Sequence, residues 1–403
     1  MSPAYLDPPN PQAPPPRSVR LRRGVGRVLA AVSAPGPQQA PAATRILLIR
    51  PDHLGDLLFL GPALRWLRQQ APELDLTLAI GPWGRPALPG LSGGYDHLIE
   101  IPFPAFERGQ RAGLAERWSL LPRAARTLRQ ERFDAAIVFR PDHWWGAMLA
   151  AWAGIPRRIG YVTPETTPWL TAALPLPHEH AAASNLRLAG QLLGRPSPLT
   201  PDAAPVHFSL TAADRAAASS LLASRNLQPS IFNLPSTLGQ PLIVLHPGAG
   251  AAIKLWEPDK WGAVARQLHQ EGAVVVVTGG PDEQALAAAV VAAAGEGVVN
   301  LAGQTPFGVL AALLAAASLV LGPDSGPLHL AVAVGTPTVH LFGPADPVRF
   351  GPWGAPPARH RVLVSGWTCA PCGKLDWTDL PGHGCVRDIT PAQVLEAARA
   401  LLG

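Results

Sequence analysis

Short apolar runs alternate with amphipathic stretches through the first half of this chain. Residues 46–49 (ILLI) form a run typical of a strand buried on both faces. A polar turn follows, and leucines then recur at helical spacing over 57–67. This alternation predicts an α/β domain with a parallel sheet. Further strands are expected at 76–80, 98–101 and 135–139, and further helices at 114–132 and 147–153.

The same rhythm returns after a mixed, Pro-rich stretch that spans 196–241. Strands are expected at 242–245, 273–278, 298–299, 319–321 and 338–342, and helices at 212–224, 261–271, 283–294, 307–317, 328–334 and 391–402. We therefore predict two similar α/β halves, in which ligands bind beyond the carboxyl ends of the strands. The expected division is a leader over 1–43, domains over 44–205 and 206–390, and a C-terminal helix over 391–403.

The leader differs from the rest of the chain because it is Pro-rich and has no strand pattern. We expect most of it to be disordered. Between residues 20 and 32, apolar and basic side chains fall on opposite sides of a helical wheel, a pattern that suits a helix in peripheral contact with an anionic membrane. Gly24 and Gly26 disfavour a helix, so a weakly helical leader is the alternative.

Composition narrows the choice of partners and compartment. The chain has 403 residues, 47% of them hydrophobic and 15% charged, with a net charge of +5. No long basic run is interleaved with aromatic residues, so nucleic-acid binding is not expected. The cysteines do not form the dense, even set of a secreted scaffold, and neither a signal peptide nor a membrane-spanning run is visible. We expect a cytoplasmic protein.

Three glycine-containing turns at strand ends carry the candidate chemistry. In the turn after the first strand, Asp56 is either a helix cap or a general base. The second-half loops at 246–250 (HPGAG) and 322–326 (GPDSG) expose amides that suit phosphate oxygens, although each is also consistent with an ordinary tight turn. Two such loops in one half strengthen the phosphate interpretation. The candidate donor-site residues are Gly248, Ala249, Gly250, Lys254, Asp324, Ser325, Gly326 and His329.

Other residues have open interpretations. Glu283, after the strand ending near Thr278, could bind ribose hydroxyls or be an ordinary first-turn acid. Trp144 and Trp145 suit stacking on an acceptor sugar, but tryptophan also fills cores. Cysteines and a histidine near the end have the spacing of a structural zinc site, with a redox pair or plain thiols as alternatives. The candidate ligands are Cys369, Cys372, His383 and Cys385.

Taken together, these motifs resemble glycosyltransferase family 9, the ADP-heptose:lipopolysaccharide heptosyltransferases. The resemblance runs from Ile46 to Leu402 and is carried by ILLIRPDHLGDLLFLGPALRWLR, AGIPRRIGY, HAAASNLRLAGQLLG, HPGAGAAIKLWEPDKW, VVVTGGPDE and LGPDSGPLHLAVAVGTPTVHLFGPADP. It implies a GT-B fold, in which two Rossmann-like domains face each other across a cleft. The N-terminal half would receive a lipid-linked saccharide acceptor, and the C-terminal half would bind an ADP-sugar.

The resemblance also implies roles for individual residues. Asp56 matches the family's general base, and Lys254 matches the lysine on the donor phosphates. The segment from Asp324 to His329 matches the part that holds the donor sugar and pyrophosphate, and Arg50 is a candidate acceptor contact. Ala249 and Gly250 depart from members that carry hydroxyl side chains there. The implied reaction is an inverting displacement that requires no cofactor.

Two other classes of protein compete with this interpretation. One is a non-catalytic GT-B-like protein that binds nucleotide sugars, and the intact Asp56 argues against it. The other is a Rossmann oxidoreductase, which would carry GxGxxG after the first strand, where this chain has RPDHLGD. A family member that uses another donor sugar is a further alternative.

Overall fold

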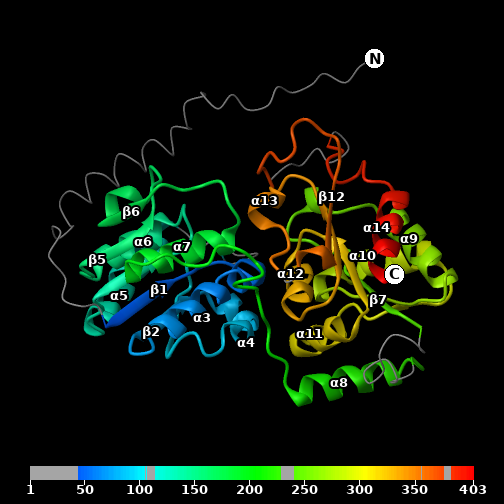
Figure 1. Ribbon diagram of the computed structural model, residues 1–403, viewed down its shortest axis with the longest axis horizontal. Helices are drawn as coiled ribbons and strands as arrows, with labels where there is room; N and C mark the ends of the chain where they lie inside the picture. The colour runs from blue at the N-terminus through cyan, green and yellow to red at the C-terminus, as the bar shows by residue number, and fades with distance from the viewer. Residues whose placement is uncertain (1–43, 105, 107–113, 228–239, 355, 376–382) are drawn as a thin grey trace. The chain divides into compact units, whose positions relative to one another are not determined.

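The computed structural model describes residues 44–104, 106, 114–227, 240–354, 356–375 and 383–403, with the backbone alone for 114–118. The leader and its expected amphipathic helix lie outside these residues. The chain divides into two compact units, Met1–Leu199 and Thr200–Gly403, drawn blue to green and green to red in Figure 1.

Unit 1 is a doubly wound α/β unit built on one parallel six-stranded sheet. Its strand order is β3-β2-β1-β4-β5-β6, the order of a Rossmann domain, with the switch point between β1 and β4. The strands are β1 Arg45–Ile49, β2 Asp75–Ile80, β3 His97–Glu100, β4 Ala135–Val138, β5 Arg157–Tyr161 and β6 Ala172–Leu174. The helices are α2 Leu54–Leu58, α3 Gly61–Gln70, α4 Leu88–Leu91, α5 Leu114–Gln130, α6 Trp144–Trp152 and α7 Ala181–Leu193, with 3-10 turns at Pro82–Ala87 and Thr167–Trp169.

Both faces of this sheet are covered. Leu47 and Ile49 of β1 point into a core formed with α5 and α6, while α3 and α7 pack together elsewhere in the unit. Ile46 and Leu48 are fully buried but do not belong to that core, so by strand alternation they face the other side. The helix expected over 57–67 is two helices, because Pro62 lacks an amide hydrogen and is accommodated in the first turn of α3, which begins at Gly61.

Unit 2 repeats the architecture with the order β12-β11-β10-β7-β8-β9, so its switch point lies between β7 and β10. The strands are β7 Leu242–Leu245, β8 Val274–Val277, β9 Val298–Asn300, β10 Leu319–Pro323, β11 Thr338–Phe342 and β12 His360–Val364. The helices are α8 Ala212–Ala223, α9 Pro258–Gln270, α10 Gln284–Ala294, α11 Phe307–Ala316, α12 Gly326–Ala333, α13 Pro347–Phe350 and α14 Pro391–Leu402, with 3-10 turns at Ala252–Lys254, Pro281–Glu283 and Pro357–Arg359. In Figure 1, α8 lies beside α11.

The ends of unit 2 are attached to its body. Val206 donates its amide to the carbonyl of Trp353, and Phe208 donates to the carbonyl of Ala333, so the segment after residue 200 belongs with this unit. α14 begins at a capping box formed by Thr390 and packs against α9. The C-terminal helix is therefore part of the core of unit 2.

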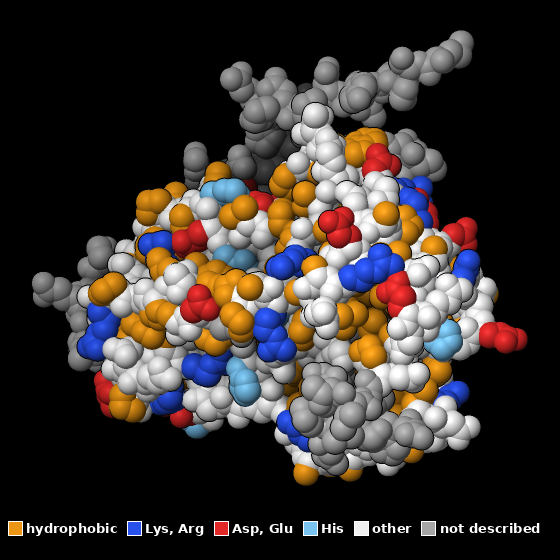
Figure 2. All heavy atoms as spheres, turned by 45° about the vertical axis from the view of Figure 1, so that its right-hand side comes forward, with side chains coloured by type: hydrophobic (Ala, Val, Ile, Leu, Met, Phe, Trp, Pro, Cys, Tyr) orange, Lys and Arg blue, Asp and Glu red, His pale blue; other side chains and the backbone are white. Residues whose placement is uncertain are grey.

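Figure 2 shows basic and acidic side chains interspersed among apolar ones on the face in view. Within the described ranges, no helix is both long enough and apolar enough to cross a membrane.

Candidate active site

Asp56 lies where β1 meets the sheet's switch point, in the first turn of α2. The N-cap position of this helix is occupied by His53, so Asp56 is not the cap. Asp56 Oδ1 accepts a hydrogen bond from Arg50 Nη2 at 3.0 Å, and the Asp56 side chain is 35% exposed. A carboxylate that is fixed by an arginine and is partly exposed is suited to accept a proton from a bound hydroxyl.

Arg50 is buried, although an acceptor contact was expected of it. Its side chain is 5% exposed, and its Nη1 donates to Asn185 Oδ1 on α7 at 3.2 Å. Its Nε lies 2.6 Å from Asp52 Oδ2. Because all three guanidinium nitrogens face protein oxygens, the prediction that Arg50 contacts the acceptor is wrong for this structure.

A second arginine joins the first across the switch point. Arg140, after β4, donates through Nη1 to Asp52 Oδ1 and through Nε to Asp142 Oδ1 at 2.7 Å. Burial raises the pKa of Asp52, but Arg50 and Arg140 outweigh it and hold that pKa below the usual value. Of this network, only Arg50 was among the candidate residues. The sequence does carry a signal for the rest, because the tetrapeptide RPDH occurs at both 50–53 and 140–143.

The two tryptophans predicted at the acceptor surface differ in burial. Trp145 is 3% exposed and packs edge-to-face on Phe103, with ring centroids 5.7 Å apart. It cannot offer a ring face to a sugar, so for Trp145 the core interpretation is correct and the acceptor interpretation is wrong. Trp144 is the first residue of α6 and is half-buried against the same core.

In unit 2, Lys254 and Asp324 meet across the switch point. Lys254 ends the 3-10 turn after the HPGAG loop, and its Nζ lies 2.5 Å from Asp324 Oδ2 after β10. His329 Nε2 lies 3.2 Å from the other carboxylate oxygen. Burial would raise the pKa of Asp324, but the His329 hydrogen bond and the Lys254 charge lower it to about 2. Asp324 is therefore a charged group inside the unit, and Lys254 neutralises it.

The start of α12 presents unsatisfied donors. Ser325 is its N-cap residue and is 8% exposed, and its Oγ has no hydrogen-bond partner among the described residues. Gly326 follows as the first helical residue, and the first amides of a helix have no partner within it. A phosphate oxygen bound here would accept hydrogen bonds from the buried Ser325 hydroxyl and from the amides at the start of α12.

The structure also brings Glu283 to the first donor loop. A Cβ on Gly248 would lie 2.0 Å from Glu283 Oε1, so any other residue there would require the Glu283 carboxylate to move. Glu283 Oε2 accepts a hydrogen bond from the Gly280 amide at 2.7 Å and lies 3.5 Å from His246 Nε2. Burial lowers the pKa of His246. Ala249 and Gly250, as expected, offer only backbone groups.

The C-terminal cysteines do not support the expected zinc site. No group of three or more His, Cys, Asp or Glu side chains is placed to hold a metal ion in the described part of the chain, which includes all four candidates. The thiols differ in depth: Cys369 is exposed, Cys372 half-buried and Cys385 buried. Spacing along the chain alone therefore does not establish a metal site here.

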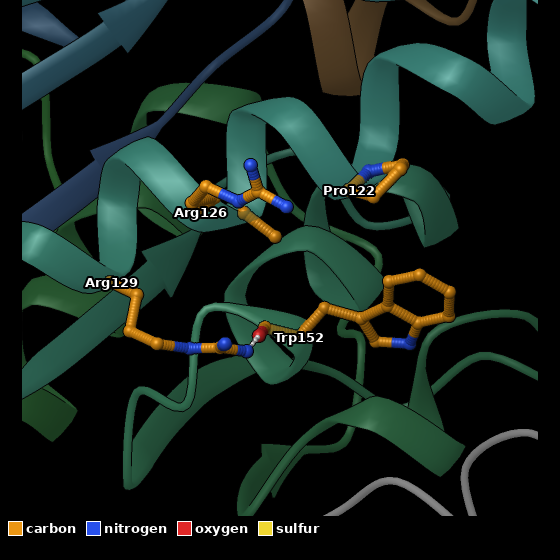
Figure 3. Close-up of a pocket in the computed structure, with 5 residues that line it drawn as sticks. Pro122, Arg126, Arg129 and Trp152 are labelled. Atoms are coloured by element: carbon orange, nitrogen blue, oxygen red, sulfur yellow. Dashed lines mark hydrogen bonds between the residues drawn. The ribbon is translucent and has the colours of Figure 1, made fainter.

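A hollow on the helical face of unit 1 contains none of the predicted residues. Figure 3 shows it between α5 and α6, lined by Pro122, Ala125, Arg126, Arg129 and Trp152. Trp152 ends α6, whereas Asp56 and Arg140 lie at the end of the sheet where α6 begins. The hollow is therefore separate from the polar loops.

Each unit thus has Rossmann strand order and a charged cluster at its switch point, which is the arrangement of a nucleotide-dependent α/β enzyme. Residues 121–375 match the sequence profile of glycosyltransferase family 9 (heptosyltransferase), and the chain belongs to this family. It is a glycosyltransferase with the α/β GT-B fold.

Individual relatives cover nearly the whole chain. Lipopolysaccharide heptosyltransferase 2 of Salmonella typhimurium is 28% identical over 377 residues, which is 89% of this chain and 98% of the relative. Lipopolysaccharide heptosyltransferase 3 of Escherichia coli is 29% identical over 74% of this chain and 83% of its own length. The solved structure of E. coli ADP-heptose lps heptosyltransferase II has a TM-score of 0.66 and 25% identity, over 89% of this chain and 98% of its own.

Proposed function

We propose that this enzyme transfers a heptose from ADP-heptose to a saccharide acceptor of the lipopolysaccharide core type. In this proposal unit 2 binds the donor and unit 1 binds the acceptor. The donor and the acceptor in this proposal are taken from the names of the relatives. An E. coli heptosyltransferase solved with ADP-2-deoxy-2-fluoro heptose, which is 20% identical to this chain with a TM-score of 0.58, has the same fold. The observation that carries the donor assignment is the pair formed by half-buried Lys254 and buried Asp324, beside the Ser325 hydroxyl that has no partner among the described residues.

In the donor half, the diphosphate would lie at the start of α12 and along the HPGAG loop. Ser325, Gly326 and the amides of Gly248 and Gly250 would donate hydrogen bonds to its oxygens. Lys254 would supply a positive charge to the same oxygens while remaining paired with Asp324.

Two further side chains complete the proposed donor site. His329 fixes the Asp324 carboxylate, which would accept a hydrogen bond from a sugar hydroxyl. Glu283 would accept hydrogen bonds from ribose hydroxyls, because its carboxylate is held against Gly248 at the edge of the loop.

The proposed step is a single displacement at the anomeric carbon. Asp56 removes the proton of the acceptor hydroxyl, the hydroxyl oxygen forms the new bond to the anomeric carbon, and the bond from that carbon to the phosphate oxygen breaks. ADP leaves with the bonding electron pair, and the configuration at the carbon inverts. Lys254 and the α12 amides stabilise the negative charge that grows on the leaving diphosphate. No step in this scheme is assigned to a metal ion.

Cellular location is part of the same proposal. We propose that the enzyme acts in the cytoplasm and that the basic part of the leader contacts an anionic membrane, where a lipid-linked acceptor would lie. The leader lies outside the described residues, so this part rests on its sequence pattern alone.

Calorimetric titration tests the donor half of the proposal. Wild-type protein is titrated with ADP-heptose, ADP-glucose, UDP-glucose, GDP-mannose and NAD, and the titration is repeated with Lys254→Ala and with Arg399→Ala, a control on α14 whose guanidinium pairs with Glu271. Selective binding of ADP-heptose that weakens in Lys254→Ala alone supports the proposal. Preference for a UDP- or GDP-sugar would remove the heptose assignment, and binding of none would favour a protein without a donor site.

A further inference from the structure

We propose that Asn185 and Arg50 are positioning residues that fix the carboxylate of Asp56 for proton abstraction. This inference rests on the proposed role of Asp56 as general base. Neither residue is expected to touch substrate: Asn185 is 1% exposed and Arg50 is 4% exposed. Their effect on the reaction would pass through Asp56.

The helix that carries Asp56 depends on contacts from outside itself. α2 has five residues, and its N-cap residue His53 makes no side-chain capping hydrogen bond. A helix this short is not stable alone, because it forms few hydrogen bonds for the dihedral angles it fixes. The direction in which Asp56 points is therefore set by what holds the two ends of α2.

Asn185 reaches both ends of this helix from α7. Its Nδ2 donates to the carbonyl of Phe59, the C-cap residue of α2, at 3.0 Å. Its Oδ1 accepts from Arg50 Nη1 at 3.2 Å, and Arg50 Nη2 in turn donates to Asp56 at 3.0 Å. One buried amide thus holds the end of the helix and, through one guanidinium, the carboxylate near its start.

The side-chain amide of Asn185 bonds away from its own helix. α7 runs from the His180 cap to the left-handed Gly194, and both of these side-chain bonds of Asn185 reach residues more than a hundred positions earlier. Burying an amide is unfavourable unless its polar atoms are bonded. A leucine would fill this place in a helix core without that cost, so the link to Arg50 and Phe59 accounts for the asparagine.

Arg50 is held at two of its nitrogens, so the position of Asn185 also fixes the nitrogen that faces Asp56. Its planar guanidinium is fixed by Asn185 on one nitrogen and by Asp52 on another, and Asp52 is itself held by Arg140. A guanidinium offers its donors in a fixed fork, so anchoring two nitrogens also fixes the third, which faces Asp56. A misplacement of about 1 Å in a reacting group can cost roughly 100-fold in rate.

The first test compares Asn185→Leu with Ser184→Ala. Ser184 is the neighbouring buried polar residue on α7, and its hydroxyl contacts Glu179 rather than Arg50. We expect Asn185→Leu to lower kcat by about 10- to 100-fold, while donor affinity measured by calorimetry stays that of wild type. Ser184→Ala should retain wild-type kcat. Equal kcat values in the two variants would overturn the inference.

The second test replaces the arginine itself. Arg50→Lys keeps the charge, but one ammonium cannot span Asn185, Asp52 and Asp56 as the guanidinium does, so kcat should again fall with donor affinity unchanged. Arg158→Lys is the matched control, because Arg158 is a buried arginine of the same sheet whose guanidinium donates to backbone carbonyls. A wild-type kcat in Arg50→Lys would contradict the inference.

A double variant separates this inference from the proposed function. In Asp56→Asn, adding Asn185→Leu should lower the residual rate no further, because the positioned base is already gone. An undiminished effect of Asn185→Leu in that background would mean that Asn185 acts elsewhere, and only the positioning inference would fail. A wild-type rate in Asp56→Asn would instead remove the proposed base.

Discussion

The Lys254–Asp324 pair gives the most quantitative prediction. Lys254→Met removes the cation but leaves the Asp324 carboxylate, whose side chain is 7% exposed. The pKa of that carboxyl is lowered from 3.8 to about 2, which corresponds to about 2 kcal/mol in favour of the charged form. Without Lys254, His329 is left to oppose the effect of burial on Asp324. We therefore expect the free energy of unfolding at pH 7 to fall by about 3 kcal/mol, the lower end of the range for breaking a buried pair.

The assay is urea unfolding of wild type, Lys254→Met, Asp324→Asn and the double variant. The double variant should be more stable than Lys254→Met, because it has no uncompensated buried charge, yet neither should bind ADP-heptose as wild type does. Equal unfolding midpoints for wild type and Lys254→Met, or a double variant no more stable than Lys254→Met, would refute the reasoning. Such results would mean that Asp324 is not a desolvated partner of Lys254.

The sign of the pH dependence follows from the same carboxyl. A lowered pKa in the folded state stabilises the protein above the unfolded value of 3.8, and that stability is lost as pH falls through the folded value of about 2. The destabilisation caused by Lys254→Met should therefore shrink over this interval, since Asp324 becomes protonated and no longer needs a cation. A difference from wild type that stays constant down to the acid end would contradict the assignment.

Three further predictions concern single positions. Gly248→Ala should weaken ADP-heptose binding in calorimetry, because the new Cβ would lie 2.0 Å from Glu283 Oε1; affinity equal to wild type would show that the loop and Glu283 move apart freely. Trp145→Ala should destabilise unit 1 by about 3–5 kcal/mol without changing the acceptor KM, and a selective rise in that KM would restore Trp145 to the acceptor surface. Iodoacetamide at pH 8 should label exposed Cys369 in the folded enzyme but spare Cys385, whose pKa burial raises to about 11; mass spectrometry showing Cys385 labelled first would contradict its burial.

The sequence pattern predicted most of the fold because apolar runs mark strands that are buried on both faces. The expected strands at 46–49 and 242–245 are central strands of their sheets and lie beside the switch points. The pattern missed β5, whose first residues are two arginines. Arg158 is nevertheless buried, since its guanidinium donates to the carbonyls of Trp169 and Ile155, a set of contacts that no local periodicity contains.

Two of the four edge strands, β6 and β12, were missed for a different reason. β6 has three residues, and β12 has only one buried position, at its first residue. Such short or partly polar strands resemble loops, because their place in the sheet depends on pairing with a neighbour rather than on their own hydrophobicity.

Part of the site was predictable because its loops follow strands that the sequence pattern predicts. Lys254 and Asp324 are 70 positions apart, but both follow strands that flank one switch point, so strand topology brings them together. Asn185 was not singled out, although it lies in the segment HAAASNLRLAGQLLG, because nothing in an Ala/Leu-rich helix indicates which residues a single asparagine contacts. Its importance appears only when the path from α7 to Arg50 and Asp56 is known.

The central claim is tested most directly by the transfer reaction itself. Purified enzyme is incubated with ADP-heptose and a lipopolysaccharide core acceptor that lacks heptose, and the acceptor is analysed by mass spectrometry and the released nucleotide by chromatography. We predict that the acceptor gains one heptose for each ADP released, with inverted anomeric configuration, and that Asp56→Asn binds ADP-heptose but transfers the sugar far more slowly than wild type. Transfer at the wild-type rate in Asp56→Asn, or wild-type enzyme that transfers only from a different nucleotide sugar, would contradict the proposed function.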